Sequence, residues 1–252
     1  MQPEERRKWV ADLNKQSHRL NSLAIIAMTH RLIKPGRLAL VSSFGAEAVV
    51  LLHLVAQVDA DLPVLFIDTD LLFTETLRYQ QQVSALLGLT NVQIIRAKAD
   101  QHTRIDPLGQ LHQSDPDACC YLRKTAPLNH ALRRFDGWIS GRKRFQGSSR
   151  ATVAWFEMDP DRDKIKINPL AQWSRNDVDQ YLTKINCHDT HWSTRAIPQL
   201  AVCPARRPSR PAKTPDRGDG LDRPKRNAAC TALAPPNSLK GRTYDTRRPN
   251  NR

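Results

Sequence analysis

Residues 37–47 read RLALVSSFGAE, and this stretch decides the fold class. Its first half is a short, nearly continuous apolar run, typical of a strand buried on both faces of a parallel sheet. The run ends in Ser42, Ser43 and Gly45, and residues 46–57 read as a helix. Backbone N–H groups at a helix start, beside two hydroxyls and a glycine, predict an anion site. An ordinary strand-to-helix turn is the alternative.

The same alternation of strand and helix signals continues along the chain. Strands are expected at 63–67, 91–97, 137–141, 151–158 and 164–168, and helices within 4–34 (two), at 74–88, within 117–134 (two pieces) and from Ser174 to about Lys184. We therefore predict an α/β fold with a doubly wound, mostly parallel sheet. Ligands bind at the carboxyl ends of such strands. Asp68 stands at one such end, where it either binds a ribose hydroxyl or starts a loop.

A basic loop follows the expected strand at 137–141. It reads GRKRFQGSSR over residues 141–150, so four cations, Arg142, Lys143, Arg144 and Arg150, lie around two glycines. Guanidinium and ammonium groups at a strand end form a good cradle for phosphate or sulfate. A solvated basic loop is the alternative, but the glycines and the strand-end position favour binding.

Two cysteines, Cys119 and Cys120, are adjacent in the sequence. Neighbouring cysteines rarely form a disulfide with each other, because the small ring is strained. Two such thiolates can ligate a metal cluster when two more come from elsewhere. A pair of buried thiols is the alternative. Lys124 follows closely and suits either a thiolate or an anionic substrate.

The net charge of +14 is concentrated at one end of the chain. Residues 187–252 hold 14 Lys and Arg against 5 Asp and Glu, and 9 of the 17 prolines, with no defensible helix or strand pattern. We predict a body at 1–186 and an aberrant, disordered tail at 187–252. A basic nucleic-acid-binding protein is the non-enzyme alternative. The tail contains no recognisable nucleic-acid-binding module, so we expect no nucleic-acid partner.

Location follows from hydropathy and from the first residues. No apolar run approaches the roughly 20 residues of a membrane span, and the first ten residues, MQPEERRKWV, are charged without an apolar signal region. We therefore expect a cytoplasmic protein with no membrane partner. In that compartment cysteines favour metal or redox chemistry over structural disulfides.

Five motifs occur in a characteristic order. They are SSFGAE at 42–47, LFIDTD at 65–70, CCYLRKTAPL at 119–128, ISGRKRFQG at 139–147 and KINPLAQWS at 166–174. Together they resemble the assimilatory adenylyl-sulfate (APS) and phosphoadenylyl-sulfate (PAPS) reductases, over roughly residues 20–185. ATP pyrophosphatase-type enzymes are an alternative on the same fold, but their loop usually reads Ser-Gly-Gly-x-Asp-Ser.

The resemblance implies a fold, a substrate and a cofactor. The fold would be adenine-nucleotide α-hydrolase-like. Ser42, Ser43 and Gly45 would meet the nucleotide phosphate, and Lys124 and Arg142 with neighbouring Lys143 and Arg144 would face the phosphosulfate. The Cys119–Cys120 pair would mark the branch with a [4Fe–4S] cluster, which typically uses APS, whereas the PAPS branch lacks the pair. The activity would be reduction of APS to sulfite and AMP, with thioredoxin as electron donor.

Two further family motifs are missing from the chain. A Cys-x-x-Cys pair and a Glu-Cys-Gly-x-His sequence, which carries the nucleophilic cysteine, should follow the last helix of the body. Cys187, Cys203 and Cys230 stand alone, and none lies in Glu-Cys-Gly. Back-translation of the tail, read in another frame with synonymous codons chosen freely, yields His-Pro-Leu, Cys-x-x-Cys and Glu-Cys-Gly-Met-His in order.

This match predicts a single-base deletion near Asn186, in the gene or in its sequencing. We therefore predict that the chain as printed holds no [4Fe–4S] cluster and does not reduce APS, since it supplies two of four cluster thiolates and no nucleophile. Nucleotide binding by the body does not depend on the missing motifs.

Overall fold

The computed structural model of this 252-residue chain describes residues 2–147 and 150–186, so the predicted tail at 187–252 lies outside the described residues. Its strands are β1 (Leu38–Ser42), β2 (Val64–Ile67), β3 (Val92–Ile95), β4 (Gly137–Ser140), β5 (Phe156–Asp159) and β6 (Lys164–Ile167). The longer helices are α1 (Pro3–Ser17), α2 (Ser22–Leu32), α3 (Ala48–Ala56), α4 (Thr74–Leu86), α8 (Ala126–Leu132) and α9 (Arg175–Asn186). Each of these twelve elements confirms an expected strand or helix, with bounds shifted by a few residues.

The six strands form one sheet in the order β3-β2-β1-β4-β6-β5. Every pair is parallel except β5–β6, which is antiparallel. The predicted doubly wound, mostly parallel sheet is therefore confirmed. The chain runs outward from β1 to β3 and then returns to β4 on the other side of β1. Between β1 and β4 the strand order reverses, which is the place where sheets of this class bind ligands.

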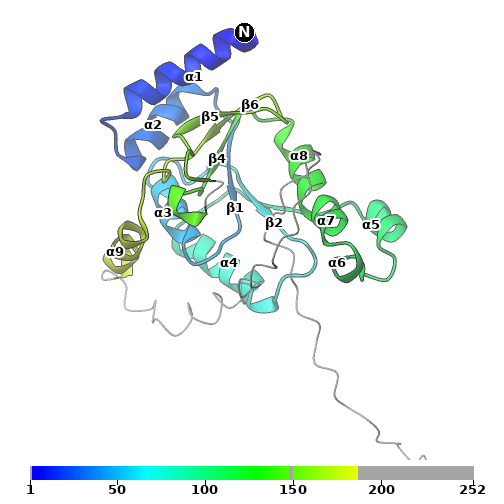
Figure 1. The fold of residues 1–252 in the computed structure, drawn as a ribbon. Coiled ribbons are helices and arrows are strands. Elements are labelled where there is room, and N and C mark those ends of the chain that lie inside the picture. The colour runs from blue at the N-terminus through cyan, green and yellow to red at the C-terminus, as the bar shows by residue number, and fades with distance from the viewer. Residues whose placement is uncertain (1, 148–149, 187–252) are drawn as a thin grey trace, which may run out of the picture.

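Helices cover both faces of the sheet (Figure 1). On one face, α2, α3 and α9 pack on the larger core cluster, which includes Ile26, Leu52 and Val178. On the other face, α8 packs on a smaller cluster around Leu132 and Trp138. The central strands are covered by helices on both faces, which explains why their side chains are apolar on both faces. The described residues include no helix that is both long and apolar enough to cross a membrane.

Gly137 shows why β4 fits between β1 and β6. A Cβ atom there would lie 2.6 Å from Ile33 Cδ1 and 2.7 Å from Ile165 Cγ2. These distances are too short for non-bonded carbon atoms, so a side chain at position 137 would force Ile33 and Ile165 to move. The glycine therefore allows β4, which leads into the basic loop, to pack closely against Ile33 and Ile165.

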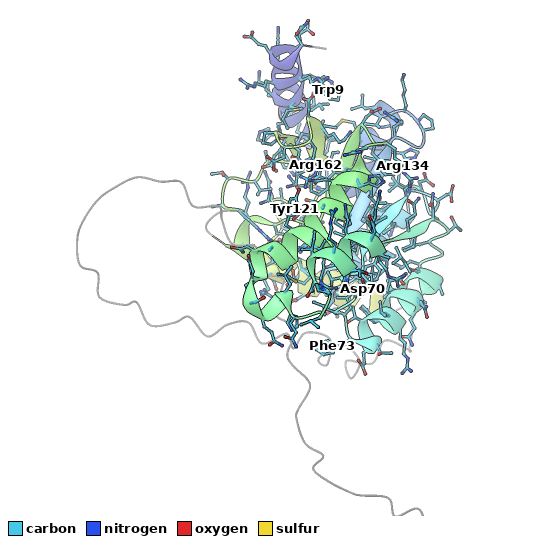
Figure 2. All side chains as sticks on the ribbon, turned by 90° about the vertical axis from the view of Figure 1, so that its right-hand side faces the viewer. Trp9, Asp70, Phe73, Tyr121, Arg134 and Arg162 are labelled. Atoms are coloured by element: carbon cyan, nitrogen blue, oxygen red, sulfur yellow. The ribbon has the colours of Figure 1, made fainter. Side chains whose placement is uncertain are left out.

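Two short helices, α5 (Ala99–Ile105) and α6 (Leu111–Ser114), have no counterpart among the predictions. Neither buries a side chain, so neither shows the apolar period that marks a helix in sequence. They precede α7 (Pro116–Cys120), which continues through a π-helical turn at Tyr121–Thr125 into α8. Figure 2 looks onto this side of the molecule, where Tyr121 and Phe73 are 62% and 54% exposed.

Candidate functional site

The loops that follow β1 and β4 face each other across the switch point. The two strands are in register, with Val41 opposite Ser140, so both loops leave the sheet at the same edge. Between them lies a cleft of about 460 Å3. Its lining includes five of the predicted substrate-binding residues, namely Ser42, Ser43, Gly45, Arg142 and Lys143. Two motifs about 100 residues apart in sequence therefore form one site.

The β1 loop forms one wall of this cleft. Ser42 Oγ accepts a hydrogen bond from Phe44 N at 3.1 Å. Phe44 holds the turn with φ of 52°, and its buried ring packs edge-on against Phe66. The left-handed residue is therefore Phe44 and not Gly45, where a Cβ would meet only Ser43 Oγ at 3.7 Å. The loop leads into α3, whose first N–H, at Ala48, donates to Gly45 O at 2.8 Å. The positive end of the helix dipole favours an anion on this side of the cleft.

Cations come from the β4 loop and from the π-helical turn. Arg142 and Arg150 both line the cleft. Burial and the charge of Arg142 lower the pKa of Arg150, and burial and the charge of Arg150 lower the pKa of Lys124. Arg150 is thus repelled by Arg142 and in turn repels Lys124, although Lys124 is not among the residues that line the cleft. An anion between Arg142 and Arg150 would relieve that repulsion, so the cleft favours a phosphate or sulfate group.

Two other predicted binding residues support the loop instead. Lys143 is 2% exposed, and its Nζ donates to Glu47 Oε2 at 3.0 Å and to Gly141 O at 3.3 Å. Arg144 Nε donates to Val153 O at 2.8 Å. Both side chains are thus engaged by the protein, and their contacts hold the loop in place.

Asp68 lies at the end of β2 and is 3% exposed. Its Oδ2 accepts hydrogen bonds from Arg96 Nε at 3.0 Å and Arg96 Nη2 at 2.7 Å. Its Oδ1 accepts one from Asp70 N at 3.0 Å. The carboxylate therefore starts the loop after β2, which is one of its two predicted roles, and Asp68 is not among the residues lining the cleft.

Cys119 and Cys120 end α7, immediately before the π-helical turn. Cys119 is completely buried, and burial raises the pKa of its thiol despite the nearby charge of Arg123. The described residues contain no group of three or more His, Cys, Asp or Glu side chains that could hold a metal ion. A four-thiolate cluster needs two further cysteines, and Cys187, Cys203 and Cys230 lie outside residues 2–147 and 150–186. The described part alone therefore does not fit a [4Fe–4S] cluster.

Arg150 is the fourth cation of the predicted basic cradle, and the structure places it in the lining of the cleft. Two other residues, Glu47 and Lys166, were not among the predicted binding residues. Glu47 ends the β1 motif and contacts the cation loop. Lys166 lies on β6 with its Nζ 4.7 Å from the ring centre of Trp138, and burial and then Arg142 lower its pKa to about 8. A lysine alternating with isoleucines in Lys164–Ile167 was the available signal for Lys166.

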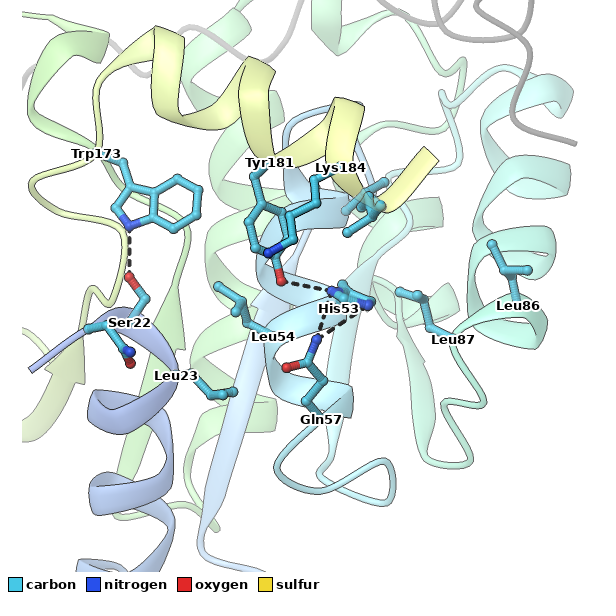
Figure 3. Close-up of a pocket in the computed structure, with 13 residues that line it drawn as sticks. Ser22, Leu23, His53, Leu54, Gln57, Leu86, Leu87, Trp173, Tyr181 and Lys184 are labelled. Carbon is cyan, nitrogen blue, oxygen red and sulfur yellow. Dashed lines mark hydrogen bonds between the residues drawn. The ribbon is translucent and has the colours of Figure 1, made fainter. Parts of the chain in front are cut away.

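A larger cavity of about 610 Å3 lies away from this edge, under α9 (Figure 3). It is bounded by α2, α3, α4 and α9, and its lining is mostly apolar. There Trp173 Nε1 donates to Ser22 Oγ at 2.7 Å, and the Tyr181 hydroxyl lies 2.9 Å from His53 Nδ1. These contacts attach α9 to the core and present no cluster of charges.

The chain is similar in sequence to known reductases. Residues 37–191 match the model of the phosphoadenosine phosphosulfate reductase domain. The chain belongs to this reductase family. A relative named adenosine 5'-phosphosulfate reductase, from Mesorhizobium japonicum, is 47% identical over 163 residues, which are 65% of this chain and 63% of that protein. One of the same name from Chelativorans sp. is 37% identical over 203 residues, or 80% of this chain and 82% of that protein.

The fold of this reductase-family chain also matches a solved structure. The phosphate complex of the phosphoadenylyl-sulfate reductase from Candida auris superposes with a TM-score of 0.59 and 21% sequence identity. The match covers 73% of this chain and 87% of that one. The predicted adenine-nucleotide α-hydrolase-like fold is therefore confirmed.

Proposed function

We propose that this chain binds adenylyl sulfate in the cleft between the β1 and β4 loops. The observation that carries the proposal is that Arg142 and Arg150 line this cleft at the switch point, together with the Ser42–Gly45 loop that leads to α3. The phosphosulfate would lie against these cations, and its phosphate would also meet the Ser42–Gly45 loop. The two relatives named adenosine 5'-phosphosulfate reductase support this nucleotide over its 3'-phosphorylated form.

The reaction we propose for the complete catalytic machinery has two steps. A cysteine thiolate attacks the sulfur of adenylyl sulfate, the sulfur–oxygen bond breaks, and AMP leaves with its electron pair. A dithiol donor such as thioredoxin then attacks the resulting S-sulfocysteine and releases sulfite. Its two thiols supply both electrons and end as a disulfide. We also propose a cytosolic location, where such dithiols are kept reduced.

The chain as printed would bind the nucleotide without reducing it. Cys119 is buried with a raised pKa, so it is a poor nucleophile. Neither Cys-x-x-Cys nor Glu-Cys-Gly-x-His occurs in the sequence. The family match ends at residue 191, shortly after the predicted reading-frame break, which supports that break.

Calorimetric titration of the full chain with adenylyl sulfate tests the binding proposal. We expect saturable binding that is tighter than binding of AMP, because AMP lacks the sulfate that would contact the cations. The 3'-phosphorylated nucleotide should bind more weakly than adenylyl sulfate. Absence of any nucleotide binding would refute the proposal.

Restoring the predicted frame by one inserted base at codon 186 tests the catalytic proposal. The restored chain should contain about four iron atoms and release sulfite with thioredoxin, whereas the printed chain should do neither. Sulfite release by the printed chain, or an iron-free and inactive restored chain, would contradict us. Resequencing the junction shows which chain the gene encodes.

A further inference from the structure

The carboxylate of Glu47 joins three elements around the cleft. Glu47 precedes α3, and its Oε2 accepts hydrogen bonds from Lys143 Nζ at 3.0 Å and from Gln146 Nε2 at 3.3 Å. Its Oε1 lies 3.2 Å from Arg175 Nη1, at the start of α9. One side chain of the β1 motif therefore contacts both the cation loop and the last described helix.

The side-chain amide of Gln146 lies between Glu47 and Arg150 and is hydrogen-bonded to both. Because its Nε2 faces the Glu47 carboxylate, its Oε1 faces the other way and accepts from Arg150 Nη1 at 2.6 Å. The same oxygen accepts from Lys143 N at 3.2 Å. Glu47 at one end of the amide and Lys143 N at the other therefore present Oε1 to Arg150. A neutral side chain at position 47 would remove the charged partner of Nε2, and the Arg150 contact would be held less firmly.

The charges around Glu47 agree with a fixed, ionised carboxylate. Burial raises the pKa of Glu47, but the hydrogen bond and charge of Lys143, with Arg175 and Gln146, lower it below its usual range overall. Lys143 is almost fully buried, and Glu47 is its ion-pair partner. The ion pair therefore persists at neutral pH and fixes the two loops relative to each other.

We propose that Glu47 is a positioning residue that holds Lys143 and, through the amide of Gln146, aims Arg150 into the nucleotide cleft. This inference rests on the proposed function, since Arg150 is aimed at the phosphosulfate. Glu47 itself would not touch the nucleotide, because its carboxylate is repelled by the same anionic groups. Its effect on binding would pass through Arg150.

Calorimetry with adenylyl sulfate on the full chain tests this role. Glu47→Gln should weaken binding about tenfold, as expected when one charge-assisted hydrogen bond to the ligand is misdirected. Gln146→Leu should weaken it to a similar degree. Glu75→Gln, a change of the same chemistry at an exposed position in the first turn of α4, should leave the affinity unchanged.

A double-mutant cycle separates positioning from a merely structural effect. If Glu47 acts through Arg150, Glu47→Gln should cause no further loss in an Arg150→Ala background. Glu47→Gln alone leaves Lys143 as an unpaired buried cation, so it should also lower the melting temperature. Adding Lys143→Met should restore the melting temperature without restoring the affinity, because Arg150 stays misdirected.

Three outcomes are decisive. Unchanged affinity of Glu47→Gln, or losses that add fully to those of Arg150→Ala, would overturn the positioning role while leaving the proposed function intact. Failure of the wild-type chain to bind adenylyl sulfate would refute the proposed function instead. In that case crystal structures of the wild type and of Glu47→Gln test the positioning role directly. The role requires that Arg150 contact Gln146 in the wild type and lose this contact in Glu47→Gln.

Discussion

The carboxyl end of β2 and the paired ends of β1 and β4 lie at the same edge of one sheet, and both carry charged side chains. At β2 the charges cancel locally, since Asp68 is buried against Arg96 at 2.7 Å. At β1 and β4, Arg142 and Arg150 line an open cleft and lower the pKa values of their cationic neighbours. We call these the closed end and the open end. The difference teaches that a charged strand end forms a binding site where its side chains line an open cleft. Arg142 does so with Arg150, although its Nη1 lies 3.9 Å from Glu157 Oε2.

Removing the two cations of the open end should cause the largest loss of nucleotide affinity. Arg142→Ala combined with Arg150→Ala should weaken adenylyl-sulfate binding by at least about 100-fold, since two charge-assisted contacts of about 1.5–3 kcal/mol are lost. The melting temperature should change little, because relief of the mutual repulsion offsets the lost contacts of Arg150 with Gln146 and of Arg142 with Glu157. Calorimetry and thermal unfolding measure the two quantities. An equal loss of affinity in Arg96→Ala, at the closed end, would abolish the distinction between the ends.

Asp68→Asn should show the opposite pattern at the closed end. The charge-assisted bonds to Arg96 would be weakened, so the free energy of unfolding should fall by about 1–3 kcal/mol. Nucleotide affinity should change less than about threefold. Denaturant unfolding and titration of the same preparation provide both values. A collapse of affinity at unchanged stability would instead assign Asp68 to the ribose.

Proton uptake sharpens the description of the open end. The pKa of Lys166 is lowered to about 8 by burial and then by Arg142, so near pH 8.5 the amine is mostly neutral. An anion beside Arg142 would favour the ammonium form and raise this pKa. Binding at pH 8.5 should therefore take up a fraction of a proton, and binding at pH 6.5 none, because Lys166 is charged in both states there.

Calorimetry in buffers of different ionisation enthalpy measures this uptake, and Lys166→Met should abolish it.

The lowered pKa of Lys166 also predicts how stability depends on pH. The unfolded chain, with the lysine pKa near 10.5, binds more protons than the folded chain between about pH 8 and 10.5. Unfolding free energy should thus rise with pH in that window relative to Lys166→Met. A flat difference would show that Lys166 is not buried as described.

Arg144→Met should have the smallest effect on binding. Arg144 belongs to the same basic loop, but its Nε is held by Val153 O at 2.8 Å. Affinity should change less than about twofold, and stability should fall by about 0.5–1.5 kcal/mol for the lost hydrogen bond. A tenfold loss of affinity would mean that the side chain leaves Val153 and joins the open end on binding.

Most of the fold was predictable because its signals are local. The apolar run before Ser42 and the capped start of α9 each depend on a few neighbouring residues. The helices α5 and α6 were missed because they bury no side chain and so carry no period. The site loops were also predictable, since polar residues after buried strands mark the ligand edge.

Which residues of those loops face the ligand was not predictable from their type. Lys143 and Arg144 look as suitable as Arg142 in the sequence, yet Glu47 and the Val153 carbonyl occupy them. Glu47 lies 96 residues from Lys143, so that pairing depends on how β1 and β4 come together. Val153 lies nine residues from Arg144 on the same connection between β4 and β5, and its carbonyl meets Arg144 only because that connection folds back on itself.

The sequence by itself determined the strand-and-helix alternation, the family motifs and the absence of the catalytic cysteine motif, because these are properties of residue order. Only the tertiary structure decided that β1 and β4 are neighbours, that their loops share one cleft, and that Glu47 and Arg96 each neutralise one set of charges while Arg142 and Arg150 face the cleft. The physical reason is that the interaction energy of two charges depends on the distance between them. Whether a cation is neutralised or left to bind a ligand therefore depends on side chains that are remote in the sequence.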